Sequence, residues 1–192
     1  KHDLALRYND ISILENHHCA TFFGLLVREE CDFLSGLSRK EFTTLRGLVV
    51  ACILNTDMAR HFNLLEDFKQ TEKMPKGWSS SEAGRRTLLS MVVHCADIGN
   101  PLRSWGVYKK CADRIADEFC EQVRLEDHFN LPRTAHMEGL EKAVARAKME
   151  VGFTRVFASP TLQLLKRRFP QLEERVAVMR ENCQRWDSSK KN

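Results

Sequence analysis

Apolar residues recur at intervals of three and four positions along most of the sequence, and this periodicity is the strongest constraint on the fold. From Ile11 to Leu26, apolar side chains repeat at this spacing, which is typical of an amphipathic helix. Similar stretches cover residues 38–65, 88–95, 108–123, 135–157 and 171–186. No segment alternates apolar and polar residues as a half-buried strand would. The sequence therefore predicts an all-α protein built as a multi-helix bundle.

Breaks in the helical pattern are few, since the 192 residues include only five prolines and nine glycines. The main breaks are a loop at 71–82, with a helix N-cap expected at Ser79 or Ser80, and the segment Asn130–Arg133. Pro160 and Pro170 are expected to separate the last helices. We predict one domain over residues 1–192, with a helical body at 1–183 and a polar tail at 184–192.

Composition excludes several classes of protein. The net charge of +4 is a small difference between 30 basic and 26 acidic residues, so nucleic-acid binding is not expected. The longest apolar run, residues 48–54, is too short to span a bilayer. The cysteine count is odd, seven, without CxxC spacing, which favours reduced thiols in a cytoplasmic protein. Any membrane association is expected to depend on regions outside this chain.

The segment from His94 to Pro101, with the sequence HCADIGNP, carries the most chemical information. An apolar helix brings Asp97 to its C-terminal end, where Gly-Asn-Pro stops the helix. A buried carboxylate is unfavourable unless it is paired or bound to a metal, and His94 is close enough in sequence to share the same helix face. From spacing alone, an ordinary helix end with a salt-bridged Asp97 remains the commoner explanation.

Three further segments accompany this one in a fixed order. They are YNDISILENHH at residues 8–18, TDMARH at 56–61 and VGF at 151–153. Together the four segments resemble the YND-x-S-x-LENHH, TDMxxH, HxADxxNP and QVGF motifs of class I cyclic nucleotide phosphodiesterases. They cover essentially the whole chain, and the chain is identified as similar to the C-terminal part of that catalytic domain.

The resemblance implies a fold and a reaction. The family's catalytic domain is a compact helical bundle whose deep pocket holds two divalent metals, usually zinc with magnesium or manganese. A hydroxide between the metals attacks the cyclic phosphate, and a histidine of an HNxxH motif protonates the departing 3′ oxygen.

The resemblance also assigns residues to the metal side of the pocket. Asp97 matches a metal-ligating aspartate, and Glu15 matches a carboxylate that orients a metal-bound water. Thr56 and Asp57 match positions that line the metal pocket.

On the substrate side, Asn100 matches a polar residue near the nucleotide. Phe153, with Ile115 opposite, matches the apolar clamp around the purine ring, and Phe119 is expected nearby. Taken alone, these three apolar positions would be read as core residues, because apolar side chains at helical spacing usually are.

One departure from the family is that this sequence contains neither the HNxxH nor the HDxxHPG motif. These motifs supply three of the four ligands of the tighter metal and the general acid. His2-Asp3 does not replace them, because it stands next to the YND segment. We therefore expect a truncated domain that does not hydrolyse nucleotides or hold the metals by itself.

The other departure is Glu150, which stands where the family has a glutamine that reads the purine edge. An amide donates and accepts, so it can pair with adenine or guanine by flipping, whereas an ionised carboxylate only accepts. A protonated Glu150 would recover both kinds of bond. We expect weakened or altered selectivity, with cAMP and cGMP both left open as substrates.

The leading hypothesis is hydrolysis of 3′,5′-cyclic nucleotides to 5′-monophosphates in signalling, carried out by the complete protein. The alternative is a catalytically inactive, phosphodiesterase-like regulatory or interaction module. A homodimer is a further expectation under either hypothesis.

Overall fold

The computed structural model describes residues 2–73 and 81–189, and within these residues every regular element is a helix. The predicted all-α class is therefore confirmed. The chain divides into two compact units, Lys1–Asp97 and Ile98–Asn192, and each is described by itself. The N-cap expected at Ser79 or Ser80 lies outside the described residues. None of the described helices is long and apolar enough to cross a membrane.

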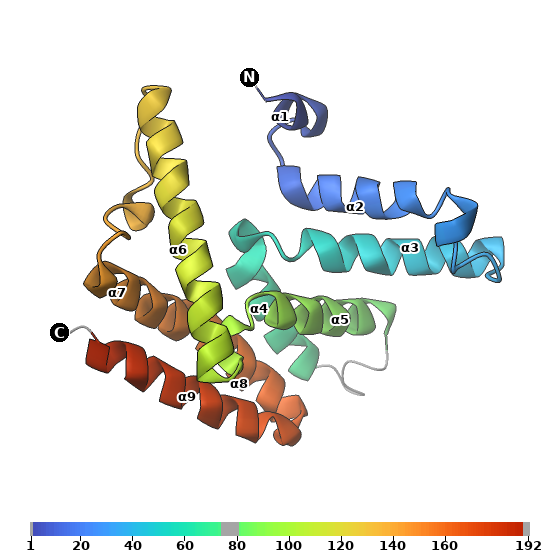
Figure 1. The fold of residues 1–192 in the computed structure, drawn as a ribbon. Coiled ribbons are helices and arrows are strands. Elements are labelled where there is room, and N and C mark those ends of the chain that lie inside the picture. The colour runs from blue at the N-terminus through green and yellow to red at the C-terminus, as the bar shows by residue number, and fades with distance from the viewer. Residues whose placement is uncertain (1, 74–80, 190–192) are drawn as a thin grey trace. The chain divides into compact units, whose positions relative to one another are not determined.

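The first unit stacks its longer helices side by side (Figure 1). Its core includes Phe23, Phe68 and Met91, all buried. A capping box, in which Ser38 and Glu41 bond each other's backbone N–H, begins α3 and satisfies N–H groups that a helix start leaves unpaired. The elements are α1 (Asp3–Tyr8), α2 (Ile13–Leu25), η1 (Glu29–Cys31), α3 (Arg39–Leu54), η2 (Met58–Arg60), α4 (His61–Glu72) and α5 (Glu82–Asp97).

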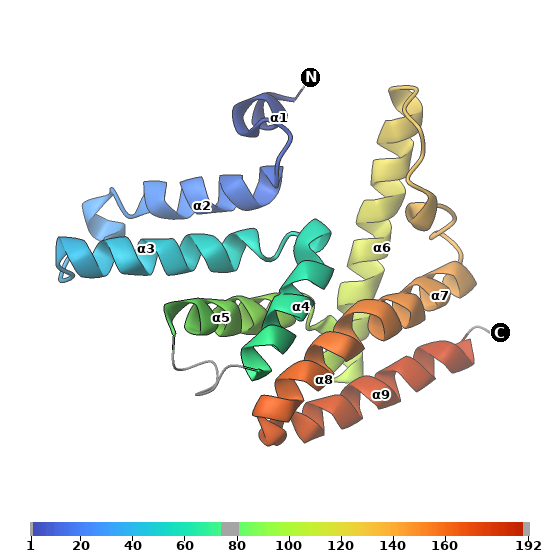
Figure 2. The same cartoon turned by 180° about the vertical axis from the view of Figure 1, so that it is seen from behind.

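In the second unit, α7 and α9 lie side by side (Figure 2). Its core cluster joins Tyr108 of α6, Val151 of α7 and Trp186 of α9. The elements are η4 (Asn100–Leu102), α6 (Trp105–His128), η5 (Ala135–Met137), α7 (Ala143–Phe153), the π-helix η6 (Thr154–Ala158), α8 (Ser159–Arg168), η7 (Pro170–Leu172) and α9 (Glu173–Ser188).

The region predicted as one helix over 135–157 differs from that prediction. It contains the short η5, then α7, and the chain passes through the π-helix into α8 with Pro160 in the first turn of that helix. The predicted break at Pro160 is wrong. Proline lacks a backbone N–H, so it is tolerated in the first turn of a helix, where that N–H would be unpaired.

The C-terminal helix continues past the boundary that we predicted at residue 183. α9 ends at Ser188, and Trp186 is only 5% exposed. The Trp186 ring packs against Trp105, with ring centroids 5.1 Å apart, and also contacts Tyr108. Burial of this large ring explains why polar neighbours in the sequence remain helical. Residues 190–192 of the predicted tail lie outside the described part.

Candidate active site

Asp97 is the last residue of α5, and its side chain is exposed. An acid at a helix C-terminus is disfavoured by the helix dipole, so local helix stability does not explain this residue. His94, three positions earlier on α5, is fully buried, and the Asp97 charge is close enough to oppose the effect of burial on the pKa of its imidazole. The turn that carries Asn100 follows directly after α5.

The buried partner of His94 is His61, the first residue of α4. Their rings are joined by a hydrogen bond of 2.8 Å between His61 Nδ1 and His94 Nε2, and both residues are 0% exposed. Burial lowers the pKa of both imidazoles, and His94 adds to the effect on His61, whose pKa falls to about 4. Both rings are therefore neutral at physiological pH, and one N–H donates to the other ring's lone pair. Sequence reasoning missed His61 as a partner.

The metal-side residues of the first unit lie around the start of α2 and the turn after α3. Glu15 lies half-buried in the first turn of α2, where the dipole favours an acid. Thr56 is half-buried in the turn, and its hydroxyl donates to the carbonyl of Ile53 at 2.8 Å.

Asp57 links the turn after α3 to the start of α2. Its Oδ1 accepts from the backbone N–H of Ala59 at 2.8 Å, and its Oδ2 accepts from the Ser12 hydroxyl at 2.6 Å. Ser12 has φ of 42°, a left-handed conformation that is uncommon for residues with a side chain. Both oxygens of Asp57 thus hold protein groups, and the residue fixes the entry to α2.

A complete metal centre does not fit the residues present. In residues 2–73 and 81–189, no three His, Cys, Asp or Glu side chains converge closely enough to hold an ion. Asp97 alone cannot supply the four ligands of a zinc site.

Asn100 is half-buried at the start of η4. The turn that carries it is held from α9 by Asn182, which is 2% exposed. The Asn182 amide donates to the carbonyl oxygens of Pro101 and Arg103 at 2.9 and 2.8 Å. A buried asparagine on a helix is a weak signal in a sequence, and we did not single out Asn182 there.

Glu150 of the second unit is a carboxyl residue that is only 5% exposed. The Tyr108 hydroxyl donates to Glu150 Oε2 at 2.6 Å, and Thr154 Oγ1 lies 3.3 Å from the same hydroxyl. Burial raises the pKa of Glu150, against the hydrogen bond from Tyr108, which lowers it, and the Asp113 charge raises it further. Burial and the Glu150 charge also raise the pKa of Tyr108, so the phenol keeps its proton and is the donor.

The three apolar candidates of the substrate side are half-buried rather than fully buried. Phe153, at the end of α7, has its ring 5.7 Å from that of Phe157. The centroids of the Phe119 and His136 rings lie 6.0 Å apart in a T-shaped arrangement. Ile115 lies one turn before Phe119 on α6. Partial exposure leaves these side chains available to a ligand, although the two phenylalanines contact different rings.

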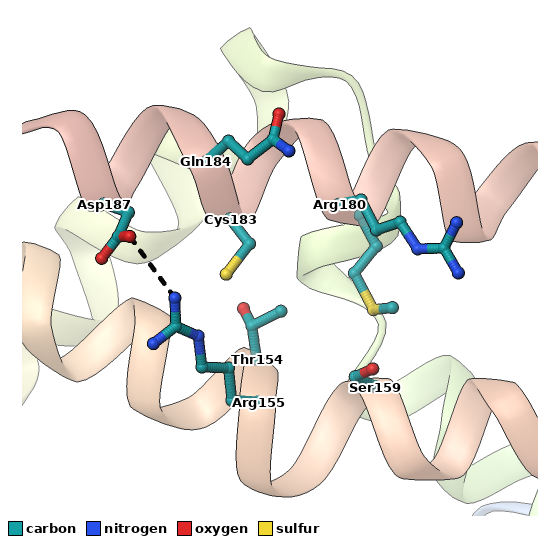
Figure 3. A pocket seen from close by; sticks show the side chains of 8 residues that line it. Thr154, Arg155, Ser159, Arg180, Cys183, Gln184 and Asp187 are labelled. Carbon is teal, nitrogen blue, oxygen red and sulfur yellow. Dashed lines mark hydrogen bonds and ion pairs between the residues drawn. The ribbon is translucent and has the colours of Figure 1, made fainter.

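A pocket of about 250 Å³ lies between the η6–α8 segment and α9 (Figure 3). Cys183 and Thr154 point toward one another across it, and an ion pair between Arg155 and Asp187, 3.4 Å long, spans one end. None of the predicted substrate residues lines this pocket. Thr154 nevertheless belongs to both the pocket wall and the hydrogen bonds around Tyr108.

Comparison with known proteins identifies the class to which this fold and these residues belong. The phosphodiesterase domain of the RhoPDE fusion protein from Salpingoeca rosetta superposes with a TM-score of 0.92 at 32% identity, over 99% of this chain and 60% of that chain. The family model of 3′5′-cyclic nucleotide phosphodiesterase matches residues 1–179. The chain therefore belongs to the 3′5′-cyclic nucleotide phosphodiesterase family.

Curated relatives agree with this assignment. The probable 3′,5′-cyclic phosphodiesterase pde-6 of Caenorhabditis elegans is 34% identical over 97% of this chain and 24% of its own length. The human high affinity cGMP-specific 3′,5′-cyclic phosphodiesterase 9A is 36% identical over 90% of this chain and 28% of its own length. The chain thus spans about a quarter of the length of these relatives.

Proposed function

We propose that the full-length protein hydrolyses 3′,5′-cyclic nucleotides, cGMP and/or cAMP, to 5′-monophosphates in cyclic nucleotide signalling. The observation that carries the proposal, beyond family membership, is the buried Glu150 held by Tyr108. It occupies the position at which the family resemblance places the residue that reads the purine edge. The half-buried Phe153 and Ile115 supply apolar surface of the kind that a base requires.

The family also implies two divalent metals, zinc with magnesium or manganese. Such ions would generate the attacking hydroxide and stabilise charge on the phosphate. The described residues do not form a complete set of ligands for these ions. Asp97 is the residue that we assign as a direct ligand in the full-length protein, and Glu15, Thr56 and Asp57 are assigned to its surroundings.

The replacement Asp97→Ala in the full-length protein tests this proposal. Hydrolysis of cGMP and cAMP should fall by more than about 100-fold, since even the loss of groups behind the ligands typically costs 10- to 100-fold. A matched control is Asp67→Ala, which removes an exposed acid from α4 of the same unit and should leave the rate unchanged. Wild-type activity that survives Asp97→Ala would remove Asp97 from the metal site.

A second candidate function is a catalytically inactive regulatory or interaction module. It is favoured by Glu150, because a carboxylate replaces the amide that would serve either purine. Full-length protein that binds cyclic nucleotides but hydrolyses neither, with added zinc and magnesium or manganese, would support the inactive module. Turnover that depends on Asp97 would exclude it.

The setting that we propose is the cytoplasm. All seven cysteines are free thiols, as expected in a reducing compartment. Fractionation of cells that express the full-length protein would test this location.

Self-association is a further proposal for the full-length protein. Val27, Phe33 and Phe62 of the first unit are 85%, 75% and 62% exposed, and large exposed apolar side chains favour association. Sedimentation of the full-length protein should give a dimer, and a monomer at high concentration would contradict this.

A further inference from the structure

Glu150 is only 5% exposed, and the protein supplies only part of the hydrogen bonding of its carboxyl group. Among the described residues, Tyr108 is the donor that reaches it, and the bond goes to Oε2. No described donor reaches Oε1, and this oxygen is not one of the described buried atoms that lack a partner, so it keeps contact with solvent. A buried carboxylate is stable only when its lone pairs accept hydrogen bonds, so this group is suited to a ligand that brings N–H donors.

The hydrogen bonds that link Thr154, Tyr108 and Glu150 all run in one direction. A carboxylate can only accept, so the Tyr108 hydroxyl uses its proton toward Glu150. Thr154 is then left to donate to the Tyr108 oxygen across 3.3 Å. This directed series holds the carboxylate at its Oε2 atom. Unlike an amide, the carboxylate presents acceptors whichever way it is turned.

The two purines differ in what they offer to such a pair of acceptors. Guanine carries two adjacent donors, N1–H and the N2 amino group, and they match two carboxylate oxygens in the manner of a bidentate pair. Adenine carries its N6 amino donor beside the N1 lone pair, which would face a carboxylate oxygen. An amide can suit adenine by flipping, but a carboxylate cannot.

We propose that Glu150 makes the second unit selective for guanine nucleotides by accepting both N1–H and N2–H of the base. The inference rests on the proposed function, in which this unit binds the nucleotide base. It adds a substrate preference, cGMP over cAMP, and a particular edge of guanine. The guanine O6, which would repel the carboxylate, then lies away from it.

The test uses 3′,5′-cyclic inosine monophosphate, which has the guanine N1–H and O6 but lacks the N2 amino group. Binding of labelled cGMP to the full-length protein is measured in EDTA, which prevents turnover, with unlabelled cGMP, cyclic inosine monophosphate and cAMP as competitors. The wild-type protein should bind cGMP roughly 10- to 100-fold more tightly than the inosine nucleotide, the effect of one hydrogen bond to a charged group. cAMP should bind more weakly still.

The variant Glu150→Gln keeps the size of the side chain and can still accept from Tyr108. In this variant the affinities for cGMP and the inosine nucleotide should come within a few-fold of each other, and cAMP binding should improve. A matched control is Glu141→Gln, an exposed glutamate just before α7, which should keep the wild-type ratios.

Equal wild-type affinities for cGMP and the inosine nucleotide would overturn the inference and leave the proposed function intact. A ratio that persists in Glu150→Gln would do the same. If none of the three nucleotides binds in EDTA and none is hydrolysed with metals present, both the proposed function and this inference fail. The wild-type comparison needs no substitution, so the inference remains testable even if the variant folds poorly.

Discussion

Asp57 of the first unit and Glu150 of the second unit differ in their hydrogen bonding. Both oxygens of the half-buried Asp57 accept hydrogen bonds from the protein. Glu150 is only 5% exposed and has a described donor on only one oxygen. Asp57 therefore holds a turn and a helix start together, whereas Glu150 keeps an acceptor oxygen available. A carboxylate oxygen that no described protein donor reaches is the better guide to a ligand.

The two tyrosines of the chain, one in each unit, test this contrast most strongly. Tyr108→Phe should lower the free energy of unfolding by about 1–3 kcal/mol, because it leaves the buried Glu150 without its described donor. Tyr8→Phe should lower the free energy of unfolding much less, since the Tyr8 hydroxyl is only partly buried and lies 3.4 Å from His17 Nδ1. Chemical denaturation of the full-length variants measures both values.

The contrast would break if the two tyrosine substitutions were equally destabilising. Cyclic nucleotide binding separates a positioning role of Tyr108 from a purely structural one. Tyr108→Phe should reduce the preference for cGMP over the inosine nucleotide, because it loosens the Glu150 carboxylate. Loss of stability with an unchanged preference would show that Tyr108 does not position Glu150.

Mild acid should weaken the first unit through its histidine pair. The pKa of His61 is lowered by burial to about 4 from an ordinary value of 6.5, so below pH 6.5 the unfolded chain binds protons that the folded one does not. The contribution of the neutral His61 to the free energy of unfolding is therefore complete above pH 6.5, the ordinary pKa that applies in the unfolded chain. It is lost as the pH falls toward 4. Between about pH 7 and pH 5.5 the loss should be roughly 1 kcal/mol.

Thermal melting of the full-length protein across this range measures the effect of the histidine pair. Replacement of His61 by Gln removes its titration and should flatten the dependence, although the variant itself is less stable. A dependence equally steep in wild type and His61→Gln would assign the acid sensitivity to other groups.

The smallest effect is expected at Ser12. Ser12→Ala removes the hydroxyl that donates to Asp57 Oδ2 and should cost about 0.5–1.5 kcal/mol, the range for one hydrogen bond in a half-buried place. Ser12→Gly removes the same bond but suits the positive φ, so it should be less destabilising than Ser12→Ala. The reverse order, read from denaturant unfolding, would mean that backbone conformation is unimportant here.

The helical class and the four motifs could be predicted from the sequence because both depend on local order along the chain. The partners of the motif residues could not. His61 and His94 are separated by 33 positions, and Tyr108 and Glu150 by 42, so only packing brings them together. For the same reason, Asp57 was predicted beside the metal pocket without its bond to Ser12 being foreseen. The roles of these residues toward metal and nucleotide remain predictions.

The prediction for the region around Pro160 was wrong for a different reason. Proline normally ends a helical pattern, but here the π-helix before it changes the spacing of the backbone bonds. The polar composition after residue 183 predicted a tail, but α9 continues to Ser188. Burial of the Trp186 side chain stabilises this part of the helix despite its polar neighbours.

The π-helix has a consequence for how this region can change in evolution. A wide turn differs from an α turn by about one residue, and each residue of a helix advances it by about 100°. Deleting one position between Thr154 and Ala158 would restore ordinary α geometry, and α8 would keep its orientation relative to Glu150 because the wide turn already absorbs the extra residue. The buried leucines of α8, Leu162, Leu164 and Leu165, would then keep their places in the core, whereas a deletion within α8 itself would rotate the residues after it by about 100°. This five-residue segment can therefore lose a residue at a smaller cost to packing than the α-helices on either side of it.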